Sequence, residues 1–213
     1  MANKLAIKKN LLLAIDAGNT NTNFAVFDGD KIIAKWRVAT DHHRTGDEYS
    51  VIIGQLMLNE NIEKSAIKNI VIASVVPQIM LQLNKFCANL FKLKPKVIGE
   101  TIKYPIKIKI DNPKEVGADR VVNAVASRKL YNKPAIIIDF GTATTFDVVD
   151  GSGAYCGGVI SPGINLSLSA LQEAAARLPR VWIKKPHKAI GKNTVDAMQS
   201  GIYFGYIGLI EGI

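Results

Sequence analysis

Two apolar runs in this chain end in the same way: each stops at an aspartate, which is soon followed by glycine and a cluster of small polar residues. Residues 11–22 have the sequence LLLAIDAGNTNT, and residues 135–145 have the sequence AIIIDFGTATT. Aliphatic runs that stop at Asp, Gly, Asn and Thr are typical of buried strands that lead into tight polar turns. Each copy therefore predicts a strand, a turn and a returning strand.

The two copies stay in register beyond the turn. Asp139 follows Asp16 by 123 positions (139 − 16), and Asp150 follows Asp28 by 122 positions (150 − 28). A gap of one residue therefore preserves the match through the returning strand and the next turn. We infer an internal duplication, with one hairpin in each half of the chain.

The two turns contain the residue types that phosphate binding needs. Gly18 and Gly141 allow the backbone to approach a ligand closely, and successive backbone N–H groups in such turns can form an anion-binding concavity. Asp16 and Asp139 would repel a bare phosphate, so the pattern favours a phosphate that carries a cation. Neither turn matches the Walker pattern or the dinucleotide-binding glycine pattern. Two ordinary hairpins with Asx-type turns are the alternative, and the duplication favours the phosphate interpretation over it.

The rest of the pattern alternates strands and helices. Thr45 and Glu48 form a capping-box pattern ahead of one helix, and Asn112 with Pro113 is a start signal for another. The expected strands after the first hairpin are residues 31–38, 70–76, 96–98 and 106–110, and the expected helices are residues 45–58, 78–91, 112–131, 161–178 and 193–213. This alternation predicts an α/β protein with two related lobes, residues 1–115 and 116–213, and a cleft between them.

Composition limits the function classes. The chain has 213 residues, of which 48% are hydrophobic and 21% charged, as in a globular protein, and no apolar run approaches the ~20 residues of a membrane span. The net charge of +9 suits an anionic ligand such as ATP. Few aromatic residues interrupt the lysine-rich stretches, so nucleic acid is not the expected partner. Cys87 and Cys156 are single and lack metal-ligand spacing, which indicates a reducing cytoplasm and no zinc site.

A glycine repeat marks the last predicted helix. The small residues, at three- and four-residue spacing among apolar ones, are Gly201, Gly205, Gly208 and Gly212. This spacing allows a second helix to approach closely, and charged residues nearby leave the apolar stretch too short for a membrane span. We expect a helix–helix contact here, at the interface of a dimer.

Five motifs, in this order and spacing, resemble those of a known family. They are Asp16-Ala17-Gly18-Asn19-Thr20, Ser74-Val75-Val76-Pro77, Asn112-Pro113 with Gly117-Ala118-Asp119-Arg120, Asp139-Phe140-Gly141-Thr142-Ala143-Thr144-Thr145, and Gly191-Lys192-Asn193-Thr194. Over essentially the entire chain they resemble the type III pantothenate kinase family. That family belongs to the actin-like ATPase superfamily, so the resemblance implies two lobes of ribonuclease H-like type with a nucleotide cleft between them.

The resemblance implies a site for ATP and two kinds of ion. The residues implied in phosphate binding are Asp16, Ala17, Gly18, Asn19, Thr20, Asn21, Thr22 and Asn23. Asp16 would lie near the Mg²⁺ that ATP carries. Thr142 would contact the nucleotide from the second lobe, and Asp139 would hold a monovalent cation, K⁺ or NH₄⁺.

The resemblance also implies a pantothenate pocket. It would be lined by Gly117, Ala118, Asp119, Arg120 and Thr194, with Asp119 as the proton acceptor. An aspartate with an ordinary pKa of about 3.9 is a weak base, but it can orient a hydroxyl and take its proton late in a loose phosphoryl-transfer transition state. In the alternative interpretation, Asp119 and Arg120 only supply a polar first helical turn, where an aspartate suits the helix dipole.

The implied activity is ATP-dependent phosphorylation of pantothenate to 4′-phosphopantothenate, the first step of coenzyme A biosynthesis, by a cytoplasmic homodimer whose pantothenate pocket draws on both subunits. Two alternatives stay open: a non-catalytic regulator of the Bvg accessory factor type, and a kinase of the same superfamily that acts on another small molecule. The presence of Asp16, Asp119 and Asp139 favours the kinase, because a protein that only binds needs no such set.

Two features depart from the family pattern. Ile110 stands nine positions before Asp119 (119 − 110), where many relatives have an aromatic residue. We therefore expect a different wall in the pantothenate pocket. The sequence also stops at Ile213, inside a predicted helix, whereas relatives continue further, so we expect the second lobe to be truncated at its C-terminus.

Overall fold

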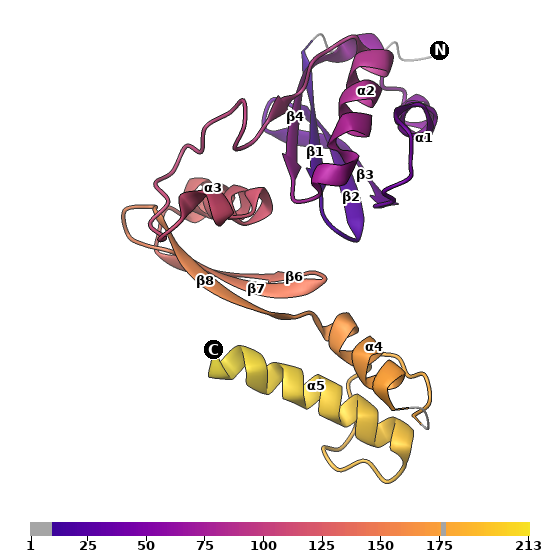
Figure 1. Cartoon of the computed structure of the whole chain (residues 1–213), viewed down its shortest axis with the longest axis vertical. Helices are drawn as coiled ribbons and strands as arrows, with labels where there is room; N and C mark the ends of the chain where they lie inside the picture. Colours follow the sequence, from indigo (N-terminus) through magenta and orange to yellow (C-terminus); the bar gives the residue numbers. More distant parts are fainter. Residues whose placement is uncertain (1–9, 176–177) are drawn as a thin grey trace, which may run out of the picture. The chain divides into compact units, whose positions relative to one another are not determined.

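The computed structural model describes residues 10–175 and 178–213, which form two compact units (Figure 1). The first unit consists of the described residues up to Pro134 together with the segment Val149–Cys156. The second unit consists of Ala135–Val148 and Gly157–Ile213. Strands and helices alternate along the chain, which confirms the predicted α/β class.

The first unit is built on a mixed sheet of five strands in the order β3-β2-β1-β4-β5. Strand β2 is antiparallel to both β1 and β3, whereas β4 is parallel to both β1 and β5. The strands are β1 (Leu11–Ala17), β2 (Asn21–Asp28), β3 (Lys31–Ala39), β4 (Ile67–Ser74) and β5 (Lys96–Val97). Because β1 and β4 are parallel, their carboxyl ends meet at one edge of the sheet, which is where ligands commonly bind in α/β proteins.

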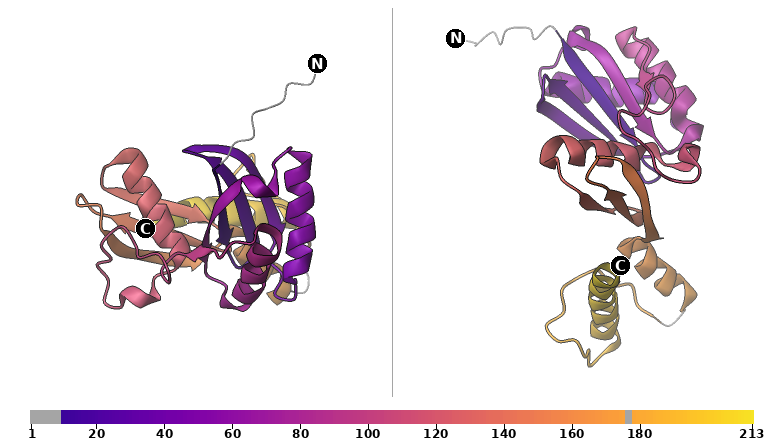
Figure 2. Two further views of the ribbon diagram at one scale, coloured as in Figure 1. Left: turned by 90° about the horizontal axis from the view of Figure 1, so that it is seen from above. Right: turned by 90° about the vertical axis from the view of Figure 1, so that its left-hand side faces the viewer.

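Two helices, α1 (Gly46–Asn59) and α2 (Met80–Phe91), pack against each other and cover one face of this sheet (Figure 2). Phe24 of β2, Tyr49 of α1 and Phe86 of α2 join the three elements, with ring centroids 6.0 to 6.1 Å apart. All three side chains are buried in an apolar core that also contains the inward-facing residues of β1 and β4. The hydrophobic periodicity of the sequence therefore predicts this half of the fold well.

The capping box predicted at the start of α1 is confirmed. Glu48 N donates a hydrogen bond to Thr45 Oγ1 at 3.2 Å, and Thr45 N donates to Glu48 Oε2 at 2.7 Å. The hydrogen bonds from Thr45 to the Glu48 carboxylate also hold the pKa of Glu48 below its ordinary value. The reciprocal pair satisfies backbone donors that the first helical turn leaves open.

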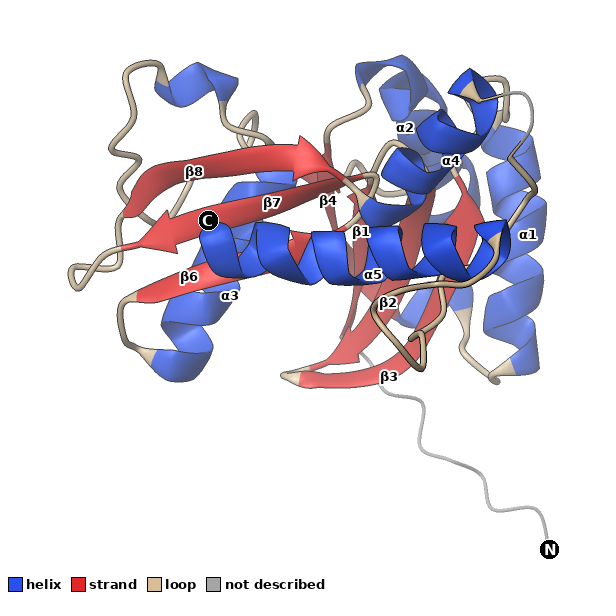
Figure 3. Cartoon of the chain, turned by 90° about the horizontal axis from the view of Figure 1, so that it is seen from below, coloured by secondary structure: helices blue, strands red, loops and turns tan. Residues whose placement is uncertain are grey.

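The second unit contains most of a three-stranded sheet, in the order β6-β7-β8, and two helices (Figure 3). Its elements are β6 (Ala135–Phe140), β7 (Ala143–Val149), β8 (Tyr155–Pro162), α4 (Ile164–Ala174) and α5 (Thr194–Gly212). A small apolar cluster of Leu168, Val181 and Met198 connects α4, the segment after it and α5.

The two sheets contain the duplication that the sequence predicts. Strands β1 to β3 and strands β6 to β8 are each three consecutive strands that pair with their neighbours in the chain. Gly18 N donates to Asn21 O in the first turn, and Gly141 N donates to Ala143 O in the second, both at 3.0 Å. The second turn is one residue shorter, which accounts for the single gap in the sequence repeat.

Two predicted elements before the second hairpin are wrong. Residues 106–110 form no strand, and only Ile108 makes an isolated bridge, to Tyr155. The helix predicted from residue 112 is divided: a short 3₁₀ helix, η3, covers Pro113–Glu115, and α3 (Ala118–Tyr131) begins later. The division arises because Val116 and Gly117 have extended backbone conformations, which no helix can include.

A strand after the second hairpin was missed. The glycine-rich segment that follows β7 forms β8, so Pro162 ends a strand instead of opening a helix. The helix predicted for residues 161–178 therefore begins at Ile164, and α4 ends at Ala174. Residues 176 and 177 of that prediction lie outside the described residues.

The boundary between the compact units differs from the predicted lobe boundary. Helix α3 belongs to the first unit, where it contacts β4, so the first division falls after Pro134 and not after residue 115. The assignment of two related lobes to residues 1–115 and 116–213 stays a prediction, because compactness and ancestry by duplication need not share one boundary.

Helix α5 begins as predicted at the Asn193 cap, whose side chain accepts a hydrogen bond from Asp196 N at 2.8 Å. Its glycine repeat lies open: nothing lies within 4 Å of a Cβ placed at Gly201, Gly205, Gly208 or Gly212. Neither α5 nor another described helix combines the length and the apolar character that crossing a membrane requires.

An ion pair between Lys109 and Asp150 stabilises the turn after β7. Lys109 Nζ donates to Asp150 Oδ2 at 2.6 Å, and this contact, with hydrogen bonds from Ser152 and Ala154, lowers the pKa of Asp150 below its ordinary range. Because the folded pKa is lowered, the stabilisation is present above the unfolded pKa of about 3.9 and is lost as the pH falls through the folded value.

We therefore expect Asp150→Asn to lower the free energy of unfolding at pH 7, and the difference from the unsubstituted protein to shrink as the pH falls below about 4. Urea unfolding at a series of pH values measures both. Glu100→Gln is the matched control: Glu100 is exposed and no side-chain partner is described for it, so this substitution should not change the free energy of unfolding at any of these pH values. An effect of Asp150→Asn that stayed constant down to pH 2 would contradict the role of the carboxylate charge.

Candidate active site

Asp16 lies at the end of β1 in a line of polar side chains that crosses three strands. The sheet register sets Asn23 of β2 opposite Asp16 and Arg37 of β3 opposite Asn23. Asn23 Nδ2 donates to Asp16 Oδ2 at 3.1 Å, and Arg37 Nε donates to Asn23 Oδ1 at 2.9 Å. These contacts orient the Asp16 carboxylate, which is exposed to solvent and so available to a ligand.

Thr40, which follows β3, holds the first turn in place. Its hydroxyl donates to Gly18 O at 2.7 Å, and its backbone N donates to Thr20 O at 2.9 Å. The Thr22 hydroxyl shares a hydrogen bond of 2.9 Å with the Thr40 hydroxyl and is fully buried. Thr22, predicted to bind phosphate, therefore supports the turn through its side chain, whereas Asn19 and Thr20 have exposed side chains.

The predicted acceptor segment reaches the same edge of the first sheet. Val75 N, just after β4, donates to Ala17 O at the end of β1, at 3.1 Å. A Cβ placed at Gly117 would lie 3.3 Å from Val75 Cγ1 and 2.5 Å from Asp119 Oδ1. The missing side chain of Gly117 thus allows the Asp119 carboxylate to lie back over the start of α3. The first unit brings the polar turn and Asp119 to one end of its sheet.

The start of α3 orients the acceptor segment. Asp119, in the first turn, accepts a hydrogen bond from Arg120 N at 2.7 Å, and its side chain is half-buried. The Arg120 guanidinium lies over the Tyr155 ring, 5.7 Å from its centroid, which is within the range of a cation–π contact. Ala118, the first residue of α3, is buried. The arrangement can orient a hydroxyl group against a carboxylate.

The second turn is supported by the start of α4. Asp139 and Thr142 have exposed side chains at this turn, and Gly163 N donates to Thr142 O at 2.9 Å. A Cβ at Gly163 would overlap the backbone carbonyl groups of Gly141 and Thr142. This role of Gly163 was not predicted: its signal in the sequence is a glycine at a helix start, 18 positions after the motif ends at Thr145 (163 − 145).

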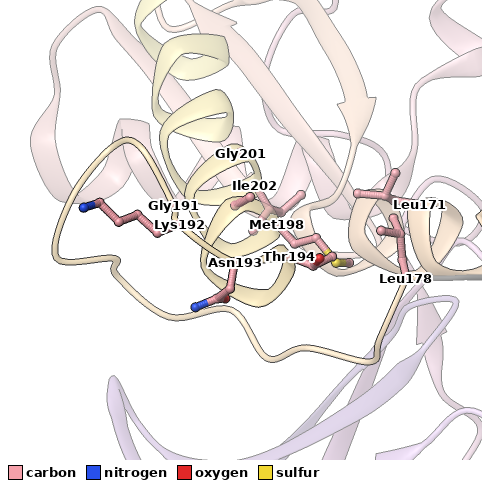
Figure 4. Close-up of a pocket in the computed structure, with 10 residues that line it drawn as sticks. Leu171, Leu178, Gly191, Lys192, Asn193, Thr194, Met198, Gly201 and Ile202 are labelled. Carbon is pink, nitrogen blue, oxygen red and sulfur yellow. The ribbon is translucent and has the colours of Figure 1, made fainter.

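Thr194 lies elsewhere in the second unit, at the start of α5. It opens onto a pocket of about 710 Å³ between α4 and α5 (Figure 4). The apolar side chains of Leu171, Leu178 and Met198 line this pocket, and its polar lining residues are Lys192, Asn193 and Thr194. The pocket can take a small ligand with an apolar part and a polar end.

Thr194 and the second turn are separated along α5. Tyr206, twelve residues after Thr194 (206 − 194), contacts Thr144 of β7. At a rise of 1.5 Å per helical residue, this spacing corresponds to about 18 Å. The second unit therefore does not bring Thr194 next to Thr142, although both belong to the predicted site.

The acidic residues fit a cation that is held largely by phosphate. Among the described residues, no three His, Cys, Asp or Glu side chains gather into a metal centre. Mg²⁺ in phosphoryl-transfer sites commonly uses one or two carboxylates, and takes its other ligands from water and phosphate oxygens. The exposed and oriented carboxylate of Asp16 suits such an ion, and the carboxylate of Asp139 supplies the hard oxygen that a monovalent cation prefers.

Comparison with solved structures supports the fold. A structure described as a conserved putative Baf family transcriptional activator from Campylobacter jejuni is similar over 94% of this chain and 78% of that chain, with a TM-score of 0.56 and 22% identity. At this identity the likeness concerns the fold alone, and it agrees with the predicted ribonuclease H-like class.

Comparison of sequences gives the family. Residues 12–213 match the family model described as type III pantothenate kinase. The type III pantothenate kinase of Paramagnetospirillum magneticum is 56% identical over 204 residues, which are 95% of this chain and 78% of that protein. That of Bacillus cytotoxicus is 50% identical over 203 residues, again 95% of this chain and 78% of the relative. The chain belongs to the type III pantothenate kinase family.

Proposed function

We propose that this protein transfers the γ-phosphoryl group of ATP to pantothenate, which yields 4′-phosphopantothenate for coenzyme A biosynthesis. The observation that carries the proposal is that the turn after Asp16 and the segment with Asp119 both lie where β1 and β4 end, in a chain of this kinase family. Phosphoryl transfer depends on positioning the phosphate and the accepting hydroxyl next to each other. A phosphate-binding turn beside an oriented carboxylate supplies both requirements.

Membership of this kinase family implies ATP and a divalent metal ion. Asp16 and the turn that follows it bind the phosphates, with backbone N–H groups as donors and the Asp16 carboxylate directed to the ion. A divalent ion on the phosphates neutralises charge that develops during transfer. Thr142 contacts the nucleotide and Asp139 holds K⁺ or NH₄⁺; the exposure of both side chains at the second turn supports these roles.

The acceptor site uses Gly117 to Arg120 and Thr194. Asp119 orients the primary hydroxyl of pantothenate and takes its proton as the P–O bond forms. Gly117 leaves the space in which the Asp119 carboxylate lies. Thr194 stands at the polar side of a pocket with apolar walls, which suits the methyl groups and the polar termini of pantothenate.

The protein acts as a homodimer whose acceptor pocket draws on both subunits. The open glycine repeat of α5 supports this proposal, because no described residue covers it and small residues allow a second helix to approach. A monomeric mass in solution at micromolar concentration would contradict it. Cys87 and Cys156, both free thiols, are compatible with work in the reducing cytoplasm.

A coupled assay of ADP release tests the function. We expect release that requires pantothenate and K⁺ together, falls to near background when Na⁺ replaces K⁺, and yields phosphorylated pantothenate by mass spectrometry. ADP release that ignores pantothenate but responds to another small alcohol would favour a different kinase of the superfamily. Folded protein that neither binds Mg·ATP nor releases ADP would favour the non-catalytic alternative.

A further inference from the structure

Tyr206 of α5 is a buried tyrosine with its hydroxyl next to the second polar turn. Its side chain is 7% exposed, and its hydroxyl forms a hydrogen bond with Thr144 Oγ1 of β7. Thr144 is fully buried and stands two residues after Thr142, the residue assigned to the nucleotide. Thr144 belongs to the sequence motif that predicts the turn, whereas Tyr206, the partner of the Thr144 hydroxyl, lies 62 positions further along the chain.

The hydroxyl of Tyr206 connects both sides of the turn. It donates to Pro162 O, at the end of β8, at 3.4 Å, so it can accept a hydrogen bond from the Thr144 hydroxyl. Pro162 immediately precedes Gly163, whose N–H donates to Thr142 O at 2.9 Å. The Tyr206 ring also lies beside Phe140, with centroids 6.4 Å apart. One side chain thus touches the strand before the turn, the strand after it and the segment that supports it.

We propose that Tyr206 is a positioning residue for nucleotide binding: it acts through Thr144 and Pro162 to keep the second turn in the shape in which Thr142 meets ATP. This inference rests on the proposed function, because it assigns Tyr206 to the nucleotide part of that site. Tyr206 does not touch the reacting atoms. Its contribution lies in the hydroxyl group, since the ring alone could fill the same apolar space.

A purely structural role gives a different expectation. A tyrosine that only packed α5 against the sheet would be replaced by phenylalanine with little effect on substrate binding, because the ring contact with Phe140 would remain. Removal of the hydroxyl instead leaves the buried Thr144 hydroxyl without this partner, which is costly in an apolar site. The turn is then free to relax toward other hydrogen-bond partners.

The test compares Tyr206→Phe with Tyr203→Phe. Tyr203 is a half-buried tyrosine on the same helix, for whose hydroxyl no hydrogen bond is described, so its variant removes the same group at a neutral position. We expect Tyr206→Phe to raise KM for ATP about tenfold, as loss of a buried hydrogen-bond partner predicts, and to leave KM for pantothenate within about twofold. Tyr203→Phe should leave both unchanged.

A double-variant cycle with Thr144→Val adds a second measurement. If the two hydroxyls act as one unit, Tyr206→Phe with Thr144→Val should raise KM for ATP no more than the larger single change. Unchanged KM for ATP in folded Tyr206→Phe, equal effects on both substrates, or additive effects in the cycle would each overturn the inference. Calorimetry measures the binding of Mg·ATP to the unsubstituted protein and to Tyr206→Phe in parallel. No binding to the unsubstituted protein would refute the proposed function itself. Equally strong binding to the two proteins would refute only the role of Tyr206.

Discussion

Asp119→Asn is expected to lower turnover by about 10² to 10⁴, the usual contribution of a positioned acid–base group, while the fold stays intact. The Asp119 carboxylate lies over the start of α3, at the sheet edge where β1 and β4 end, and there it can orient the accepting hydroxyl. An asparagine keeps the size of the side chain and can still accept the hydrogen bond from Arg120 N. It cannot take a proton, so the effect should fall on kcat more than on KM.

Asp111→Asn is the matched control for this experiment. Asp111 is an exposed aspartate in the segment before η3, so its substitution removes the same charge without reaching the site. We expect near-normal turnover in Asp111→Asn and unchanged circular dichroism in both variants. If purified, folded Asp119→Asn turned over normally, Asp119 would be no more than a polar residue of the first helical turn, where asparagine also serves well.

The sequence predicts the parts of this fold that depend on local signals. The two Asp-x-Gly turns, the Thr45–Glu48 capping box and the start of the last helix at Asn193 all form as expected, because each depends on residues within a few positions of one another. The one-residue gap in the repeat also has a structural counterpart in the shorter second turn. Local signals in the sequence were therefore sufficient to predict the two turns of the candidate site and the start of α5.

Elements that depend on distant partners were predicted less well. Ile106, Ile108 and Ile110 alternate with exposed residues in burial, as their pattern indicates, but the segment meets β8 only at the isolated bridge between Ile108 and Tyr155 and forms no ladder with it. Alternation predicts which side chains face inward, whereas hydrogen bonding depends on what the fold brings alongside. The opposite error occurred at β8, where glycine-rich sequence forms a strand because β7 lies next to it.

The supporting residues of the site could not be predicted for the same reason. Arg37 reaches Asn23, and Thr40 reaches the first turn, only because β2 pairs with β3 in this register, which the sequence does not show. Tyr206 reaches Thr144 from a different element altogether. Sequence motifs therefore predict the side chains that bind a ligand, whereas the three-dimensional structure is needed to identify the residues that keep those side chains in position.

Gly163→Ala is expected to lower kcat/KM for ATP by about 10², because a shift of about 1 Å in a binding group can have an effect of that size. Gly163 has φ −66° and ψ 156°, a conformation that alanine adopts freely, so the added methyl group acts only through space. That methyl would overlap the carbonyl groups of Gly141 and Thr142, which are backbone atoms and cannot rotate away as a flexible side chain would. The second turn must move, and Thr142 moves with it.

Gly54→Ala supplies the matched control, with the same substitution in the interior of α1. A Cβ there would lie 3.8 Å from Leu90 Cδ1, an ordinary contact, and the residue belongs to no part of the site. We expect it to raise the free energy of unfolding by about 0.5–1 kcal/mol, as Gly→Ala does inside a helix, with unchanged kinetics. Steady-state kinetics and urea unfolding of both variants separate the two effects. Normal kcat/KM for ATP in folded Gly163→Ala would mean that the second turn tolerates displacement, and its assignment to the nucleotide would then be wrong.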